Sequence, residues 1–177
     1  MRSMFCFRLA LLTLIPSALL AQVSLPKGFG LPVTSETASR MHVLRLTPGQ
    51  DVLEEIARYA AAHSIRAGAI VSAVGSLKKA SLRYANKDLV TALEGPFQVV
   101  ALSGTLDRET RHLHLSIADS DGVTRGGHAT RGNIVFTTLE LVIVEFLDLE
   151  FTRAPEPLSG YDELAVKRRR IYRKLSQ

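Results

Sequence analysis

Residues 97–118 read FQVVALSGTLDRETRHLHLSIA, and this stretch decides the fold. Two runs of strand length, residues 97–106 and 111–118, flank a short polar segment at residues 107–110. Residues 111–118 alternate polar and apolar side chains, which is the pattern of a half-buried strand. A polar segment of this length between two such runs suits a hairpin loop. The stretch therefore predicts an antiparallel β-hairpin.

Further apolar runs of strand length lie on both sides of this hairpin. We expect them at residues 41–46, 67–75, 80–84, 134–136 and 139–149. Turn residues separate them at Lys78-Lys79, at Glu94-Gly95-Pro96 and at Ser120-Asp121-Gly122. Short connections of this kind favour an antiparallel sheet, and the alternation of strands and helices that marks a doubly wound fold is missing.

One helix is predicted, from about Thr47 to about Ser64. Thr47 can cap it, Pro48 suits the first helical position, and Gln50 completes a capping box. Apolar side chains then recur at helical spacing at Val52, Leu53, Ile56, Tyr59, Ala60 and His63. We therefore predict an α+β fold, in which a mostly antiparallel β-sheet packs with one main amphipathic helix.

Residues 1–21 have the composition of a secretory signal peptide. Arg2 and Arg8 provide a positive start, residues 9–20 are almost wholly apolar, and Ala21 is a small residue at the expected cleavage point. A membrane span needs about 20 apolar residues, so this run is short for one. An uncleaved anchor or a misassigned start are the alternatives. We expect an exported protein, periplasmic or secreted, with no stable membrane span in the mature chain.

The net positive charge of the chain comes from its two ends. Residues 22–160 carry 14 basic and 15 acidic side chains, whereas residues 161–177 carry six basic and two acidic ones. We expect residues 22–40 to form a linker or extended arm, residues 41–152 the domain, and residues 153–177 a basic C-terminal tail. Its last part, from residue 161, is expected as a basic helix or loose tail that is solvated or contacts phosphates or anionic lipid. A domain that binds nucleic acid usually has its own basic face, and the composition gives no support for one.

Three histidines carry the strongest chemical signal. His112 and His114 are two residues apart on a predicted strand, so their rings share one face with about 6–7 Å between the Cα atoms. His128 follows Gly126-Gly127, and glycines let a backbone pass close to its neighbour. Because Cys6 lies in the predicted signal peptide, a metal would use His, Asp, Glu or backbone oxygen.

Three imidazoles with an open fourth position form one of the patterns that bind zinc. The cofactor we expect is therefore a divalent metal, with zinc as first candidate, held by His112, His114 and His128. Imidazole nitrogens that share an ion at about 2.0–2.1 Å should lie roughly 3–4 Å apart. Histidines that merely decorate an exposed strand face, or that sense pH together, are the alternatives.

Other candidate residues give weaker signals. Ser116 and Asp119 beside His114 resemble a catalytic triad only in composition, because neighbours on a strand seldom reach that geometry. Glu145 is an exposed edge charge, a buried paired carboxylate or a fourth metal ligand. Glu140 or Asp119 would be the general base if the site were that of a metal-assisted hydrolase or lyase.

His42 and His63 are expected as surface or packing residues.

Several segments together resemble the plants-and-prokaryotes-conserved (PPC) domain family over about residues 41–150. They are Gly75-Ser76 with Arg83, then residues 95–104, 112–119, 126–128 and 137–140. The resemblance implies a sheet-plus-helix domain that assembles as a homotrimer. It also implies that His112, His114 and His128 match the family's histidine positions, which in some bacterial members look like a metal site.

The resemblance carries a DNA-binding role only in part. In plants the domain accompanies an AT-hook with an Arg-Gly-Arg-Pro core, which this sequence lacks, and Pro96 replaces the arginine of the plant partner-binding Gly-Arg-Phe. We expect an exported binding protein that holds a divalent metal or a metal-held small ligand. A DNA-binding regulator and a metal-assisted hydrolase or lyase are the alternatives.

Overall fold

The computed structural model describes residues 37–109 and 111–169. The predicted signal peptide and most of the predicted arm lie outside the described residues. The elements follow in the order β1 (Ser39–Leu46), α1 (Val52–Ala62), β2 (Gly68–Arg83), β3 (Val90–Leu106), β4 (Arg111–Ala118), β5 (Thr124–Ala129), β6 (Ile134–Phe146), β7 (Leu149–Glu156) and β8 (Tyr161–Arg168).

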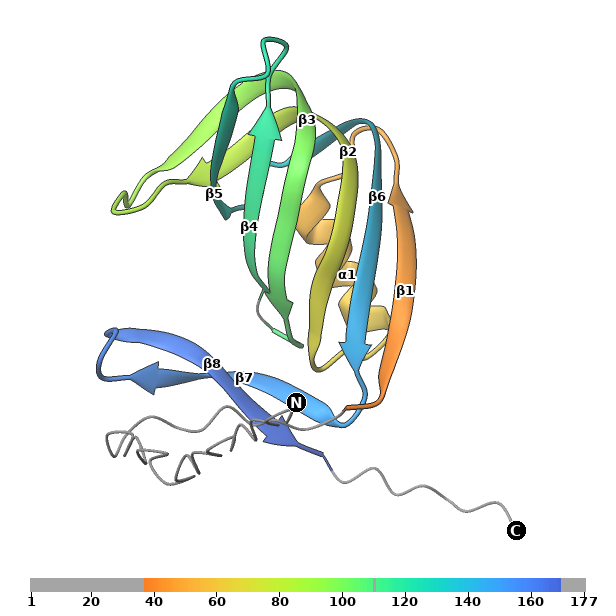
Figure 1. The fold of residues 1–177 in the computed structure, drawn as a ribbon, viewed down its shortest axis with the longest axis vertical. Coiled ribbons are helices and arrows are strands. Elements are labelled where there is room, and N and C mark those ends of the chain that lie inside the picture. The colour runs from red at the N-terminus through yellow and green to blue at the C-terminus, as the bar shows by residue number, and fades with distance from the viewer. Residues whose placement is uncertain (1–36, 110, 170–177) are drawn as a thin grey trace, which may run out of the picture. The chain divides into compact units, whose positions relative to one another are not determined.

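Six of these strands form one antiparallel sheet in the order β1-β6-β2-β3-β4-β5 (Figure 1). The end of β2 also pairs with β5, so that β2, β3, β4 and β5 close on themselves. Helix α1 lies against one face of the sheet (Figure 1) and contributes buried side chains to its core. This structure confirms the predicted fold class of a mostly antiparallel sheet that packs with one helix.

The hairpin of residues 97–118 is confirmed. β3 ends at Leu106 and β4 begins at Arg111, and the two strands pair from Gln98↔Ala118 to Leu106↔Arg111. Leu113, Leu115 and Ile117 of β4 are at most 3% exposed and belong to the main core. The alternation along β4 therefore separates a core face from an outward face.

The helix is shorter than the sequence predicts, and it begins later. Asp51 is the N-cap, and its side chain accepts hydrogen bonds from two backbone N–H groups of the first turn. Gly49 has φ of 89°, a left-handed conformation that an α-helix excludes, so the helix cannot start at Thr47. Gln50 Oε1 instead accepts from the backbone N–H of Thr47, which closes a turn before the helix. With 11 residues, α1 is a short helix and not the main amphipathic helix that we expected.

Two predicted loops are absent because β2 and β3 run through them. At Lys78-Lys79 the strand β2 continues, with a shift of register between Leu77 and Lys79. Gly95-Pro96 lies opposite this shift, inside β3. A bulge bends a strand without ending it, and a break in the ladder accommodates Pro96, which has no N–H to donate.

Residues 161–168 form the strand β8, which contradicts the predicted basic helix or loose tail. Gly160, with φ of 75°, precedes the strand, and β8 pairs with β7 through partners such as Phe151↔Val166. The backbone N–H of Phe151 donates to the carbonyl of Arg66 and so joins this hairpin to the rest of the fold. The pairing depends on a partner strand, which the basic composition of residues 161–177 does not reveal.

Among the residues that the structure describes, no helix has the length and hydropathy that crossing a membrane requires.

Candidate metal centre

The three histidines come from adjacent strands. His112 and His114 lie two residues apart on β4, and His128 on β5 is the direct partner of His114 in the antiparallel ladder. The same row continues to Ser103 on β3 and to Arg83 on β2, which pair with His114 and His128 respectively. Paired residues point to the same face of a sheet, so this row lies on the outward face of β4.

Gly127 allows β5 to lie between its two neighbours. A Cβ atom at this position would stand 2.8 Å from the backbone oxygen of Arg83, which is closer than real Cβ contacts permit. The glycines that precede His128 thus perform the role expected from the sequence: they let the backbone approach its neighbours closely. The close approach fixes His128 beside the histidines of β4.

The three rings converge on one point. One ligand nitrogen from each of His112, His114 and His128 lies within 4.8 Å of the others. The ring centroids are 5.2, 5.3 and 5.8 Å apart. Bonds of about 2.0–2.1 Å in a tetrahedral set place nitrogens about 3.3 Å apart, so small rotations of the rings would bring them to bonding distance. The predicted juxtaposition is therefore present, with the nitrogens within 4.8 Å of one another where about 3–4 Å is expected.

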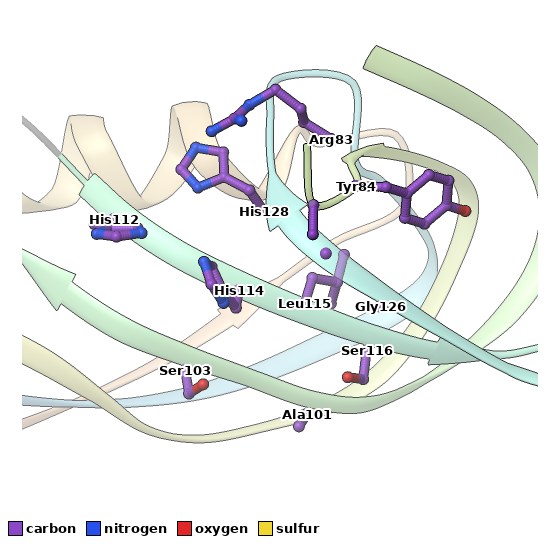
Figure 2. Close-up of a pocket in the computed structure, with 12 residues that line it drawn as sticks. Arg83, Tyr84, Ala101, Ser103, His112, His114, Leu115, Ser116, Gly126 and His128 are labelled. Carbon is purple, nitrogen blue, oxygen red and sulfur yellow. The ribbon is translucent and has the colours of Figure 1, made fainter. Parts of the chain in front are cut away.

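The rings border an open cavity of about 470 Å³. Figure 2 shows the imidazoles of His112, His114 and His128 at one side of this cavity, with Ser103 and Ser116 on the neighbouring strand positions. His112 and His114 are exposed and His128 is half-buried, so an ion or small molecule can reach them from solvent. Ligand pockets in proteins commonly have volumes of about 300–1,000 Å³.

The surroundings of His112 and His128 favour the neutral imidazole. Burial lowers the pKa of His112, and the charges of His114 and Arg153 lower it further, while Glu163 acts in the opposite direction. Burial also lowers the pKa of His128, followed by the charge of Arg83. A neutral imidazole offers a lone pair to a metal, whereas a protonated one does not.

No hydrogen bond or ion pair within residues 37–109 and 111–169 engages the ring nitrogens of these three histidines. The other two histidines do have partners: His42 bonds to Tyr59 and Glu145, and His63 bonds to a backbone carbonyl. Ring nitrogens that border a cavity and have no partners among the described residues are available for a ligand.

The carboxylates that the sequence suggested lie elsewhere. Glu145 is 8% exposed and pairs with Arg40 and His42, so of the three predicted alternatives it is the buried, paired carboxylate and not the exposed edge charge. Its place on β6 opposite β1 keeps it out of the three-histidine group. Glu140 lies on β6 as well, as the direct partner of Arg45.

The suggested triad does not form. Asp119 accepts hydrogen bonds from the backbone of Asp121 and Val123 and so stabilises the β4–β5 turn. Ser116 shares the outward face with His114 and lines the cavity, but no hydrogen bond joins the two side chains. Asp119 is thus a turn residue.

Three charged residues near the histidines were not predicted as part of the site. Arg83 lies beside His128, and Arg153 of β7 and Glu163 of β8 line two further cavities that reach His112. Arg83 belongs to the family resemblance, so the sequence contained a signal for it. Arg153 and Glu163 gave none, because they lie on the hairpin that we predicted as a tail.

A family model described as the Plants and Prokaryotes Conserved (PCC) domain matches residues 33–147. A bifunctional protein GlmU from a Synechococcus strain is 41% identical over 140 residues, which is 78% of this chain. The chain spans about a fifth of the length of that relative, 22% of it.

Solved structures share the fold of this chain. A hypothetical protein from Salmonella enterica is 43% identical, with a TM-score of 0.75, over 76% of this chain and 98% of its own. A metal-containing protein from Archaeoglobus fulgidus is 22% identical, with a TM-score of 0.64, over 73% of this chain and 95% of its own. A candidate DNA-binding protein from Bacteroides thetaiotaomicron is 16% identical, with a TM-score of 0.62, over 74% and 98%. The last two show the fold alone.

Proposed function

The chain belongs to the Plants and Prokaryotes Conserved domain family, and we propose that it binds a divalent metal ion, zinc first, through His112, His114 and His128. The observation that carries the proposal is the convergence of three imidazole nitrogens within 4.8 Å, none of them hydrogen-bonded within the described residues. Borderline divalent metals prefer imidazole ligands, and three of them leave a coordination position open.

Strand geometry supports this assignment. Two ligands come from one strand and the third from its direct partner, so the backbone ladder holds all three at fixed spacing. A site on paired strands is more exact than one on loops. The metal-containing relative from Archaeoglobus fulgidus has 22% identity, so we base the proposal on this chain's own side chains.

Metal analysis of protein purified without a histidine tag tests the proposal. We expect about one zinc ion per chain after incubation with zinc and removal of the excess. His114→Ala should lose most of this metal, because two imidazoles hold an ion much less tightly than three. His63→Ala is the matched control, since it removes one exposed histidine outside the site. Wild-type protein without stoichiometric metal, or equal metal in wild type and His114→Ala, would contradict the proposal.

DNA binding is the second candidate, because a structural neighbour is described as a candidate DNA-binding protein. Contacts to phosphates would make the affinity fall steeply with salt. A titration with duplex DNA at about 50 and 200 mM salt tests it. A fall in affinity of a hundredfold or more would support DNA binding, and no measurable binding at either salt concentration would exclude it.

A metal-assisted hydrolase or lyase would use the same three histidines together with a general base. Glu140 and Asp119 are poorly placed for this role, since neither lines a cavity that contains the histidines. Glu163 lines two cavities with His112 and is the better placed carboxylate. The binding function requires no such base and is therefore our first proposal.

Assembly as a homotrimer and export remain our predictions. Met41 and Val43 on β1 and Val71 and Val74 on β2 are each more than half exposed, and apolar groups exposed in this way often mark an interface. The mass of the protein in solution tests the trimer, and a monomer mass would exclude it. The N-terminal sequence of the mature protein tests cleavage near Ala21, and an intact Met1 would contradict it.

A further inference from the structure

We infer that the open coordination position of the metal takes a small anionic ligand, bound through carboxylate or phosphate oxygens, and that Arg83 and Arg153 hold the same ligand. This inference rests on the proposed metal site. The expected ligand is an oxyanion of the size of a small metabolite.

Arg83 stands at one edge of the three histidines. Its backbone pairs with His128 across the β2–β5 ladder, and its guanidinium lies beside the His128 ring (Figure 2). The side chain is exposed, and within the described residues no hydrogen bond or ion pair engages its guanidinium. Its charge acts on the imidazoles of both His112 and His128. A free guanidinium in this place can bind a ligand without giving up an existing partner.

Arg153 lies near His112. It lies on β7, and its Nη2 donates a hydrogen bond to Thr105 Oγ1 at 3.3 Å. Thr105 is the direct partner of His112 in the β3–β4 ladder, so this bond holds the guanidinium next to His112. Arg153 and the histidines of β4 line one shared cavity. The two arginines therefore approach the site from β2 and from β7, and both line one cavity with His112 and His128.

The charge balance calls for an anion. Three neutral imidazoles leave the full charge of a divalent ion uncompensated. The charged groups around the adjoining cavity of about 640 Å³ add one more net positive charge; they are Arg83, Arg111, Arg153, Asp162 and Glu163. An oxyanion neutralises part of this charge, which a water molecule does not. Guanidinium groups also match the planar, two-point geometry of carboxylate and phosphate oxygens.

The carboxylates of Asp162 and Glu163 place negative charge at the border of this otherwise positive site. Glu163 acts on His112 in the opposite direction to the arginines, and it lies on the exposed strand β8. An anion bound between the arginines is repelled by Glu163, whereas a cationic ligand is attracted. The sign of the effect of Glu163 on binding thus identifies the charge of the ligand.

Calorimetric titration of zinc-loaded protein tests the inference, with inorganic phosphate in one arm and malonate in the other. We expect saturable binding in at least one arm, and the stronger arm tells phosphate from carboxylate. Arg83→Gln and Arg153→Gln should each weaken binding about tenfold, the usual loss for a charge-assisted hydrogen bond. Glu163→Gln should strengthen it. Arg58→Gln on α1 is the control, because Arg58 is exposed and pairs with Glu55 outside these cavities.

The zinc content of each variant distinguishes a failure of the metal site from a failure of anion binding. Arg83→Gln and Arg153→Gln should retain zinc, since neither supplies a metal ligand. Wild-type protein that takes up no zinc overturns the metal site and this inference together. Zinc-loaded protein that binds neither anion, or binds them equally after both arginine substitutions, overturns only the anion. Weaker binding after Glu163→Gln also overturns it, because that result indicates a cationic ligand.

Discussion

The two groups of histidines in this chain differ in what surrounds their rings. In the His42 cluster, which comprises His42, Tyr59, His63 and Glu145, His42 is 7% exposed and both of its ring nitrogens have partners at 3.1 Å. His63 stacks on Tyr59 with ring centroids 3.9 Å apart. In the three-histidine cluster of His112, His114 and His128, the rings border a cavity, and their nitrogens have no such partners within the described residues.

The difference shows how the same side chain serves two purposes. A buried polar group must be hydrogen-bonded to avoid a large desolvation cost, and the His42 cluster meets this requirement across β1, α1 and β6. The Glu145 carboxylate accepts from Nε2 of His42, so that nitrogen carries a proton and cannot bind a metal. The three-histidine cluster has no such constraint, and its nitrogens can take a ligand.

Replacing His42 should produce the largest loss of stability. His42→Ala removes one buried and one partly buried hydrogen bond, and it leaves the Glu145 carboxylate with Arg40, at 3.3 Å. We expect the free energy of unfolding to fall by about 2–4 kcal/mol. Urea unfolding of the metal-free protein measures this loss.

His114→Ala is the comparison within the same experiment. Its ring is exposed and has no hydrogen-bond partner in the described residues, so metal-free protein should lose less than about 1 kcal/mol. Equal losses for His42→Ala and His114→Ala would show that the two clusters do not differ as we propose.

The next largest effect should be a loss of zinc affinity of the three-histidine cluster when the pH is lowered. The folded chain holds the pKa of His112 and His128 below the ordinary value of about 6.5 that the unfolded chain has. Protons therefore compete with a metal only below about pH 6.5, where we expect zinc affinity to fall; above it the affinity should be level. Zinc titrations at a series of pH values measure this.

The same shifts affect the metal-free protein in a defined direction. Between the lowered pKa values and about 6.5 the unfolded chain binds more protons than the folded one. The free energy of unfolding should thus be greatest above this window and decrease as the pH falls through it. A zinc affinity that already declines between about pH 8 and 7 would indicate raised pKa values and contradict the prediction.

His63→Ala should have the smallest effect. His63 is exposed, and its Nδ1 bonds only to the backbone carbonyl of Tyr59 in the last turn of α1. We expect a change of about 0.5 kcal/mol or less in the free energy of unfolding, and none in zinc content. A loss comparable to that of His42→Ala would place the stabilising contact of the cluster on the Tyr59–His63 stack instead.

The features that could be predicted from the sequence are those fixed by short-range pattern. The alternation of residues 111–118 predicts both the strand and the shared outward face of His112 and His114. The position of His128 could not be predicted from alternation alone, because its distance from His114 depends on the register of β5. The glycines before it and the family resemblance supplied that information.

The features that could not be predicted depend on distant partners. Lys78-Lys79 has the composition of a turn, but pairing with β3 and β6 keeps β2 continuous through it. Glu145 is polar in an apolar run, and only the positions of Arg40 and His42 show why it is buried. Arg153 reaches the site because β7 pairs with β8, which the basic composition of residues 161–177 concealed.

The alternation along β4 has a consequence for folding. Leu113 and Leu115 face the core while His112 and His114 face outward, so a slip of one residue in the pairing would exchange leucines and histidines. A slip of this kind would then forfeit the free energy of metal binding as well as that of burial. An ion bound here would therefore stabilise the pairing register in which the histidines of β4 face outward and its leucines face the core.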